Sequence, residues 1–487
     1  MEQFTCYLDA ETTSGSHINA DLLSYSAILV RDKDLKIVDS IDLFARPRIS
    51  RSYECDALLV NGLNPYDIYD KEKHTYSNHG IAKKLSETFT KWKNKGHVKF
   101  NAYAGFNFDF LLTSHTWFSN LYSFPWLFST NACQMDTLPL ARNMEYYNPN
   151  ILKTDINKKN HKIFKLASLC AMNGFPIKDS HTAKDDTLGL KNLTEYLKKS
   201  DSELFNKNLQ FINKKDVLPY VKNLKYFYTT ETFFSKTRQF ACCFLTEHSF
   251  YAGYILAFDL KHDPKDIFEG KSNQELSKLL FATPVKMRTI KSNRLPLILK
   301  PEEKWVQSIQ DEYSAIGKDE LEKRADYIIK NRSEIATKIN VILKDKFEEK
   351  SLDQTKLKPE EKIFALKPSK DTQRYMNDFV IANKMEEKQR IAQNFDGDED
   401  LKHLSELILI DEYGKEAFAD KDYKRIRKGI SQRLLSTNNE SYPTIPSQFL
   451  RIDEIRVQEK HDKEKLKKVE LINSHLEKMS EDHEKYL

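Results

Sequence analysis

The first 200 residues show two kinds of apolar pattern. Compact apolar runs at residues 4–8, 22–30 and 36–44 predict β-strands, and a charged cluster at residues 31–34 predicts a turn between the last two. Apolar residues then recur every three or four positions, which predicts helices. These helices are expected at residues 81–92, 108–118, 165–172 and 187–198, with a further strand at 98–103. Strands followed by alternating helices and strands indicate an α/β domain over residues 1–199.

After residue 199 the pattern changes twice. Residues 199–230 are polar with dispersed aromatics, and short apolar runs then predict a small β-rich domain, with helical insertions, over residues 200–350. Those runs occupy residues 240–245, 250–258, 279–287 and 295–299. Further on, Lys and Glu alternate with apolar residues at helical spacing, so residues 351–487 are expected to form an α-helical domain. Its last stretch, from residue 460, is interpreted as a solvated charged helix.

Composition limits the classes of protein that fit. The 487 residues carry 77 Lys and Arg against 72 Asp and Glu, a net charge of +5, so any basic track for nucleic acid must be local. The six cysteines include no C-x-x-C pair, which argues against a zinc or disulfide framework and predicts free thiols in a reducing compartment. With no signal-peptide pattern and no apolar run of about 18 residues, we expect a cytoplasmic protein without a membrane segment.

The first candidate for chemistry is the pair Asp9 and Glu11, which ends the first predicted strand. Residues i and i+2 of a strand point to the same face, so these two carboxylates converge on one spot. They repel each other unless a cation lies between them, and oxygen ligands of this kind suit Mg²⁺ or Mn²⁺. The alternative interpretation is a solvated strand end.

Two later segments carry further acids. Asp109 stands between a predicted strand and the helix that follows it, which is a common place for ligand sites in α/β sheets. The alternative is structural, because the helix dipole also favours an acid at a helix N-terminus. His181 stands five residues before Asp186, which opens another predicted helix. Taken singly, His181 could be a solvent-facing loop residue, and either Asp185 or Asp186 could merely cap the helix.

Together these segments form a pattern: D-x-E, then F-D about 100 residues on, then H-x-x-x-x-D about 70 further. This pattern resembles the DEDDh branch of the DnaQ-like 3′→5′ exonucleases. The likeness continues in other segments that resemble that family and, beyond residue 199, the bacterial exonuclease I group. Those segments are V-N-G-L at residues 60–63, M-D-T at 135–137, F-K-L-A-S-L at 164–169, T-P-V-K to N-R-L-P at 283–296 and D-E-Y-G to D-K-D at 411–422.

The resemblance implies a fold and an activity. It implies a ribonuclease H-like exonuclease domain, a mixed sheet with flanking helices, followed by an SH3-like β-rich domain and an α-helical domain. The implied activity is that of a monomeric, single-stranded-DNA-specific 3′→5′ exodeoxyribonuclease of DNA repair and recombination, which releases 5′-mononucleotides by hydrolysis with two Mg²⁺ ions or, in their place, Mn²⁺. The implied partners are single-stranded DNA and the acidic C-terminal tail of single-stranded DNA-binding protein.

The resemblance also assigns roles to residues. Asp9, Glu11, Asp109 and Asp186 are expected to hold the metals, and His181 to act as the general base. For the substrate, contacts are expected from Glu11, Thr12, Lys165 and Arg142, and from the rings of Trp126 and Phe128 by base stacking. Plain core packing is the alternative for those two rings. Contacts to the acidic tail are expected among basic residues such as Lys236, Arg238 and Arg425.

Three features depart from the family pattern. No glycine follows E-T-T, Gly105 replaces the usual asparagine before the F-D acid, and Lys165 replaces an arginine, which forfeits bidentate phosphate binding. Two alternative functions stay open: an RNA-trimming or proofreading 3′→5′ exonuclease, and a non-catalytic single-strand DNA-binding protein with a decayed nuclease core. The long chain disfavours the first, and the presence of all five acid and base residues disfavours the second.

Overall fold

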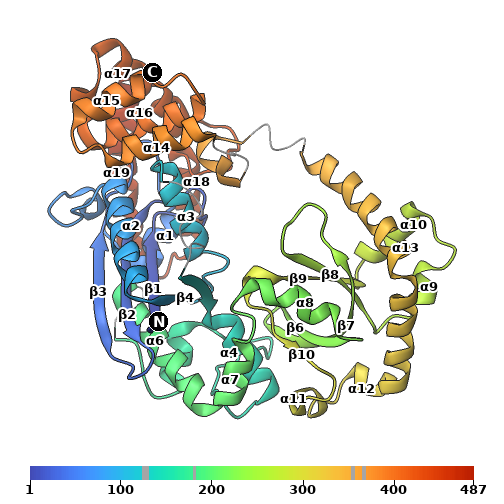
Figure 1. Ribbon diagram of the computed structural model, residues 1–487. Helices are drawn as coiled ribbons and strands as arrows, with labels where there is room; N and C mark the ends of the chain where they lie inside the picture. The colour runs from blue at the N-terminus through green and yellow to red at the C-terminus, as the bar shows by residue number, and fades with distance from the viewer. Residues whose placement is uncertain (123–130, 179–181, 352–356, 365–368) are drawn as a thin grey trace. The chain divides into compact units, whose positions relative to one another are not determined.

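The computed structural model describes residues 1–122, 131–178, 182–351, 357–364 and 369–487 (Figure 1). They form two compact units that do not follow the order of the chain. The first unit is Met1–Ala132, Lys178–Leu188 and Leu357–Leu487, and the second unit is Cys133–Ile177 and Gly189–Lys356. The division into three domains at residues 199 and 350 stays a prediction, because these units are grouped by contacts rather than by chain order.

A five-stranded mixed sheet begins in the first unit, with the strand order β3-β2-β1-β4-β5. β1 is antiparallel to β2 and parallel to β4, and β2 is antiparallel to β3. Figure 1 shows β1, β2 and β3 side by side, with α2 and α3 next to the sheet. The strands are β1 (Gln3–Thr12), β2 (Leu22–Arg31), β3 (Ile37–Phe44), β4 (His97–Ala102) and β5 (Ala132–Asp136). The predicted α/β pattern with a mixed sheet and flanking helices is confirmed.

The first unit contains helices from both ends of the chain. From the N-terminal part come α1 (Cys55–Asn61), α2 (Asn78–Lys95), α3 (Asp109–Ser119) and the 3-10 helix η1 (Asp67–Tyr69). From the C-terminal part come α14 (Lys370–Ile381), α15 (Met385–Gln393), α16 (Glu399–Tyr413), α17 (Asp420–Leu434), α18 (Ile445–Gln458) and α19 (Lys463–Glu484), with η5 (Pro359–Phe364) and η6 (Gly414–Ala417). Helix α6 (Ala183–Ser200) begins in the first unit and continues into the second. The predicted α-helical C-terminal region is confirmed.

One apolar cluster joins the N-terminal sheet to the C-terminal helices. Leu23 of β2 and Leu58 of α1 pack in the same core as buried side chains from three C-terminal helices. Those side chains are Ile426, Ile430, Ile452, Ile455, Val469, Ile472 and Leu476. The expectation that the last stretch is a solvated helix is therefore wrong, because α19 buries one apolar face, a contribution of about 1.5–3 kcal/mol for each fully buried aliphatic side chain.

A buried ionic network stabilises the loop that follows β3. The Arg48 guanidinium donates two hydrogen bonds to Asp21, at 2.8 and 2.6 Å, and Arg51 lies 3.5 Å from the same carboxylate. Burial by itself raises the pKa of Asp21, but the two guanidinium groups outweigh it and hold that pKa below its usual value. Removing one partner of such a buried group typically costs about 3–5 kcal/mol. This network was not predicted from the sequence.

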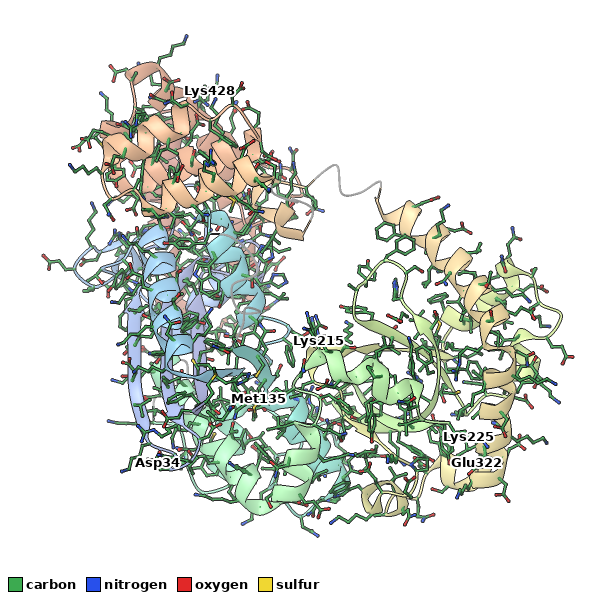
Figure 2. The ribbon with its side chains drawn as sticks, viewed as in Figure 1. Asp34, Met135, Lys215, Lys225, Glu322 and Lys428 are labelled. Carbon is green, nitrogen blue, oxygen red and sulfur yellow. The ribbon has the colours of Figure 1, made fainter. Side chains whose placement is uncertain are left out.

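The second unit is built on an antiparallel sheet with the order β10-β6-β7-β8-β9. Its strands are β6 (Phe227–Phe233), β7 (Lys236–Glu247), β8 (Tyr254–Asp259), β9 (Met287–Lys291) and β10 (Ile298–Leu299). The long helix α13 (Lys318–Ser351) packs against β7, and the Lys225 ammonium lies 3.2 Å from a Glu322 carboxylate oxygen on that helix (Figure 2). The predicted β-rich region is confirmed.

The remaining helices of the second unit surround this sheet or precede it. They are α4 (Thr137–Tyr147), α5 (Leu166–Met172), α7 (Ser202–Asn208), η2 (Lys214–Asp216), α8 (Val217–Lys222), α9 (Pro264–Phe268), α10 (Asn273–Phe281), η3 (Ser292–Arg294), α11 (Lys304–Gln307) and α12 (Glu312–Ile316). Helix α10 corrects the expectation of β-structure from residue 279. The Ser272 hydroxyl and the Glu275 carboxylate form a capping box at its start, which favours the helix.

Two expectations from composition have counterparts in the structure. All six cysteines are free, and five of them are buried. Within the ranges that the structure describes, no helix is both long enough and apolar enough to cross a membrane.

Candidate active site

Three of the predicted acids meet at one spot in the first unit. Asp9 and Glu11 lie on β1, and Asp186 lies in the first turn of α6. One oxygen from each carboxylate lies within 4.8 Å of the other two, and all three side chains are half-buried. The structure therefore selects Asp186 rather than the neighbouring Asp185 as the acid that joins the D-x-E pair.

The position of Asp9 and Glu11 follows from the register of β1. Asp9 pairs with Ser26 and Glu11 with Ser24 on β2, and the register shifts directly after Glu11. The strand pleat puts both carboxylates on one face, as the spacing predicts. After the shift, the Thr12 hydroxyl donates to the Ser14 carbonyl oxygen at 2.9 Å, so this buried side chain holds the end of the strand.

Asp186 is positioned by its neighbour Thr187. The Thr187 side chain is fully buried, and its hydroxyl donates to the Ser26 carbonyl oxygen at 3.4 Å. Ser26 is also the residue that pairs with Asp9 across the sheet. One backbone position on β2 therefore connects the start of α6 with the strand that carries the D-x-E pair.

Asp109 is the first residue of α3, as predicted, and it is buried with a side-chain exposure of only 5%. The Thr113 hydroxyl donates to the Asp109 carbonyl oxygen at 2.7 Å and lies 3.2 Å from the Tyr25 hydroxyl on β2. Since Thr113 uses its single proton on Asp109, Tyr25 is the donor in that second bond. The helix that carries Asp109 is thus tied to the sheet beneath the acids.

Gly105, one of the departures from the family pattern, has a packing reason. The Phe110 amide donates to the Gly105 carbonyl oxygen at 3.0 Å, so this turn closes directly onto the start of α3. A Cβ atom at Gly105 would lie 2.4 Å from the Ala102 Cβ and 3.1 Å from the Phe110 ring. In addition, Ala104 adopts a positive φ of 62°, which is uncommon outside glycine. This tight turn fixes where Asp109 begins its helix.

The four acids are electrostatically coupled. The pKa of Glu11 is raised to about 8. Burial is the main cause, and the negative charges of Asp186 and Asp109 contribute the rest. Burial also raises the pKa of Asp9 well above its usual range, and Asp109, Glu11 and Asp186 add to the shift. Asp109 thus acts on the same group of carboxylates even though it lies outside the tightest three. Such a set of oxygen donors, strained by its own repulsion, is what a hard divalent cation stabilises.

The other predicted site residues fall into two groups. His181, Trp126 and Phe128 lie outside the residues that the structure describes. Arg142 and Lys165 belong to the second unit. The Arg142 guanidinium carbon lies 5.7 Å from the centre of the Phe164 ring, and the exposed Lys165 is the next residue and the N-cap of α5. The role of these two cations in phosphate binding stays a prediction.

Residues that position the acids were missed by sequence reasoning. Tyr25, Thr113 and Thr187 are ordinary strand and helix residues in the sequence, and no motif distinguishes them. Their importance comes from hydrogen bonds between segments 88 and 161 residues apart. Only the apolar periodicity around Thr187 could have indicated that its side chain points inward.

Comparisons with solved structures identify the fold of this chain. No family model matches the sequence, and no curated protein matches it at a significant level. Solved structures do match over almost the whole chain. Exonuclease I from Methylocaldum szegediense superposes with a TM-score of 0.82 at 14% identity, covering 98% of this chain and 99% of that one. Escherichia coli exonuclease I in complex with a dA16 oligonucleotide gives 0.79 at 15% identity, with 98% and 100% covered.

A third structure, an ExoI/SSB-Ct complex, gives a TM-score of 0.80 at 14% identity and covers 98% of this chain and 100% of that one. The chain therefore has an α/β nuclease-type fold extended by a β-rich and a helical region. In particular, it has the fold of exonuclease I.

Proposed function

We propose that this protein is a metal-dependent 3′→5′ exonuclease that digests single-stranded DNA and releases 5′-mononucleotides, acting as a cytoplasmic monomer in DNA repair and recombination. The observation that carries the proposal is the convergence of Asp9, Glu11 and Asp186, with Asp109 coupled to them, at one end of β1. The fold adds support, since solved exonuclease I structures superpose on 98% of this chain.

The donor set fits two Mg²⁺ ions, or Mn²⁺ in their place, held by Asp9, Glu11, Asp109 and Asp186. Carboxylate oxygens without nitrogen or sulfur ligands are the donors these cations prefer. When bound, such a pair of ions lowers the pKa of a water and stabilises charge on the phosphate.

The residues of the chain perform the remaining tasks. The buried carboxylates hold a fixed arrangement because Thr187, Thr113 and Tyr25 fix their elements against β2. His181 takes the proton of the attacking water as the water oxygen bonds to phosphorus and the P–O3′ bond breaks, a task that suits an imidazole, and the released 3′ oxygen takes a proton from solvent. Thr12 and Glu11 hold the terminal nucleotide, and Arg142 and Lys165 contact backbone phosphates.

For partners we propose single-stranded DNA and the C-terminal tail of a single-stranded DNA-binding protein. Solved proteins of this fold bind each of the two. Of the three basic residues expected at the tail, Arg425 is already paired, since its guanidinium lies 2.6 Å from Glu406. Lys236 and Arg238 make no ion pair with any residue in the described ranges, and both lie on β7 of the second unit.

The test compares single-stranded and blunt duplex oligonucleotides, each labelled at the 5′ end in one sample and at the 3′ end in another, in Mg²⁺ and in EDTA. From the 3′-labelled single strand we expect a labelled mononucleotide to be the first product, and only when Mg²⁺ is present. The blunt duplex should release it more slowly. A paired end must first lose stacking worth about 0.6–2.2 kcal/mol per step. The matched RNA strand is included because equal cleavage of RNA would favour the RNA-trimming alternative.

Equal rates on duplex, or product ladders that grow from the 5′ end, would contradict the proposal. Single-strand binding without any hydrolysis in Mg²⁺ or Mn²⁺ would instead favour the non-catalytic alternative.

A further inference from the structure

The hairpin between β6 and β7 in the second unit ends in an unusual tip. Phe233 pairs with Lys236, so the loop has only two residues, Phe234 and Ser235. Both have positive φ values, 48° and 64°, as a type I′ turn requires. That turn favours Asn and Gly, and a bulky residue with positive φ is an outlier that costs free energy.

The aromatic ring at the tip contributes nothing to the core. The Phe234 side chain is 92% exposed, and it makes no ring contact with any residue in the described part of the chain. Its neighbour Phe233 behaves differently, because its ring packs edge-on against Phe240 at 6.4 Å. Phe233, itself 46% exposed, thus keeps one contact with the sheet, whereas Phe234 faces solvent at a position where the turn geometry disfavours it.

The surroundings of the tip are basic. Lys236 and Arg238 follow the tip along β7, both exposed, and neither is ion-paired among the residues that the structure describes. Among the described residues 231–238 of the hairpin, Glu231 is the only acid; it stands opposite Arg238 in the sheet, and its carboxylate lies 3.1 Å from the Arg288 guanidinium and is also influenced by Lys291. The local charge is thus positive within a chain of net charge only +5.

An exposed aromatic ring flanked by unpaired cations is the arrangement that binds single-stranded nucleic acid. Rings stack on bases of any sequence, and cations follow the phosphates. The proposed function requires a local basic track of this kind, since net charge does not provide one. An acidic peptide would also use the cations, but a ring next to two cations matches the base and the phosphate that recur at every nucleotide of a strand.

We propose that the tip of the β6–β7 hairpin is a base-stacking contact for single-stranded DNA, with Phe234 as the stacking ring and Lys236 and Arg238 as phosphate contacts. This contact belongs to the second unit, whereas the acids of β1 belong to the first. It rests on the proposed function for its substrate, and it concerns binding rather than hydrolysis.

The direct test is the variant Phe234→Trp in the full-length protein, in EDTA so that no strand is cut. Stacking on a base quenches indole fluorescence, and the emission of the four native tryptophans is subtracted with wild-type protein. We expect oligo(dT) of 20 nucleotides to quench the added emission. Phe281→Trp, at the end of α10 in the same unit and 37% exposed, is the matched control and should not respond.

A second measurement uses fluorescence anisotropy of the same labelled oligonucleotide. Phe234→Asn keeps a residue that tolerates positive φ, so it folds while removing the ring, and we expect about 5-fold or greater loss of affinity. Lys236→Gln should reduce the slope of log affinity against log salt by about 0.7, the value of one phosphate contact on a single strand.

Absence of quenching together with wild-type affinity of Phe234→Asn would overturn the proposal. Quenching by an acidic peptide with an apolar C-terminus, and not by the oligonucleotide, would also overturn it and assign the tip to a protein partner. Failure of hydrolysis in Mg²⁺ leaves this test intact, because binding is measured without metal.

Discussion

The carboxylates of the candidate site should make the metal-free protein less stable as pH rises, and Glu11→Gln should remove part of that effect. The folded state keeps Glu11 protonated up to a pKa of about 8, whereas the unfolded chain ionises it near the usual value of 4.5. Between these values the folded protein binds more protons than the unfolded one. Its free energy of unfolding therefore falls as pH rises through this window.

The magnitude follows from the same values. One proton of difference is worth about 1.4 kcal/mol per pH unit, so ionising Glu11 costs the folded metal-free protein up to roughly 5 kcal/mol across the window. Glu11 is half-buried, and water that reaches it reduces this to a few kcal/mol. Glutamine keeps the shape of the side chain and removes both the charge and its repulsion with Asp186 and Asp109.

The assay is urea unfolding at pH 5.5 and pH 8, in EDTA and in Mg²⁺, for wild type, Glu11→Gln and the control Asp185→Asn. In EDTA we expect the wild-type midpoint to fall between the two pH values and the Glu11→Gln midpoint to fall less. Mg²⁺ should raise the wild-type midpoint most at pH 8, since binding neutralises the repulsion. A Glu11→Gln protein that is less stable than wild type at pH 8 in EDTA would refute this reasoning.

Three further results are expected. His181→Ala should slow single-turnover hydrolysis by roughly 10²–10⁴-fold while Mg²⁺ affinity by calorimetry stays close to wild type, and a large loss of that affinity would make His181 a ligand. Gly105→Ala should lower the free energy of unfolding by about 1–3 kcal/mol, because its Cβ would overlap Ala102, and an unchanged urea midpoint would contradict the packing argument. Phe234→Gly should raise the thermal midpoint while weakening binding to oligo(dT), because glycine relieves the positive φ; a lowered midpoint would show that the ring stabilises the fold.

Local sequence patterns were sufficient to predict on which elements Asp9, Glu11 and Asp109 lie. Strand alternation put Asp9 and Glu11 on one face, and a break between apolar periods put Asp109 at the start of α3. From its local sequence alone, Asp186 could equally have been a helix cap, because it stands in the first turn of α6. The register of β2, through Thr187 and Ser26, places it with the D-x-E pair in the structure.

The packing between segments far apart in the chain could not be predicted from the sequence. The C-terminal helices join the first unit because apolar faces of α17, α18 and α19 bury Leu23 and Leu58, more than 350 residues away along the chain. A periodic pattern shows that a helix has an apolar face and does not identify what covers it. The same limit explains why α19 was taken as solvated. The Asp21–Arg48 pair was missed for another reason, because no local pattern shows that two charged residues 27 positions apart meet.

The error at residues 279–287 has a local cause. Leu279, Leu280 and Phe281 form a short apolar run, which periodicity cannot assign to a strand or a helix. The capping box at Ser272 and Glu275 decides for helix α10, and this signal was present in the sequence.

The proposed function requires the acid group of β1 and α6 to hold the metals with which a 3′-terminal nucleotide is hydrolysed. The most direct measurement is the rate of mononucleotide release from a 3′-labelled single strand in Mg²⁺, for Asp186→Ala beside the adjacent control Asp185→Ala. We expect that Asp186→Ala loses release to the EDTA background while it still unfolds cooperatively in urea and binds single strands, and that Asp185→Ala cleaves at close to the wild-type rate. Near-wild-type release by Asp186→Ala, or equal loss in both variants, would contradict it.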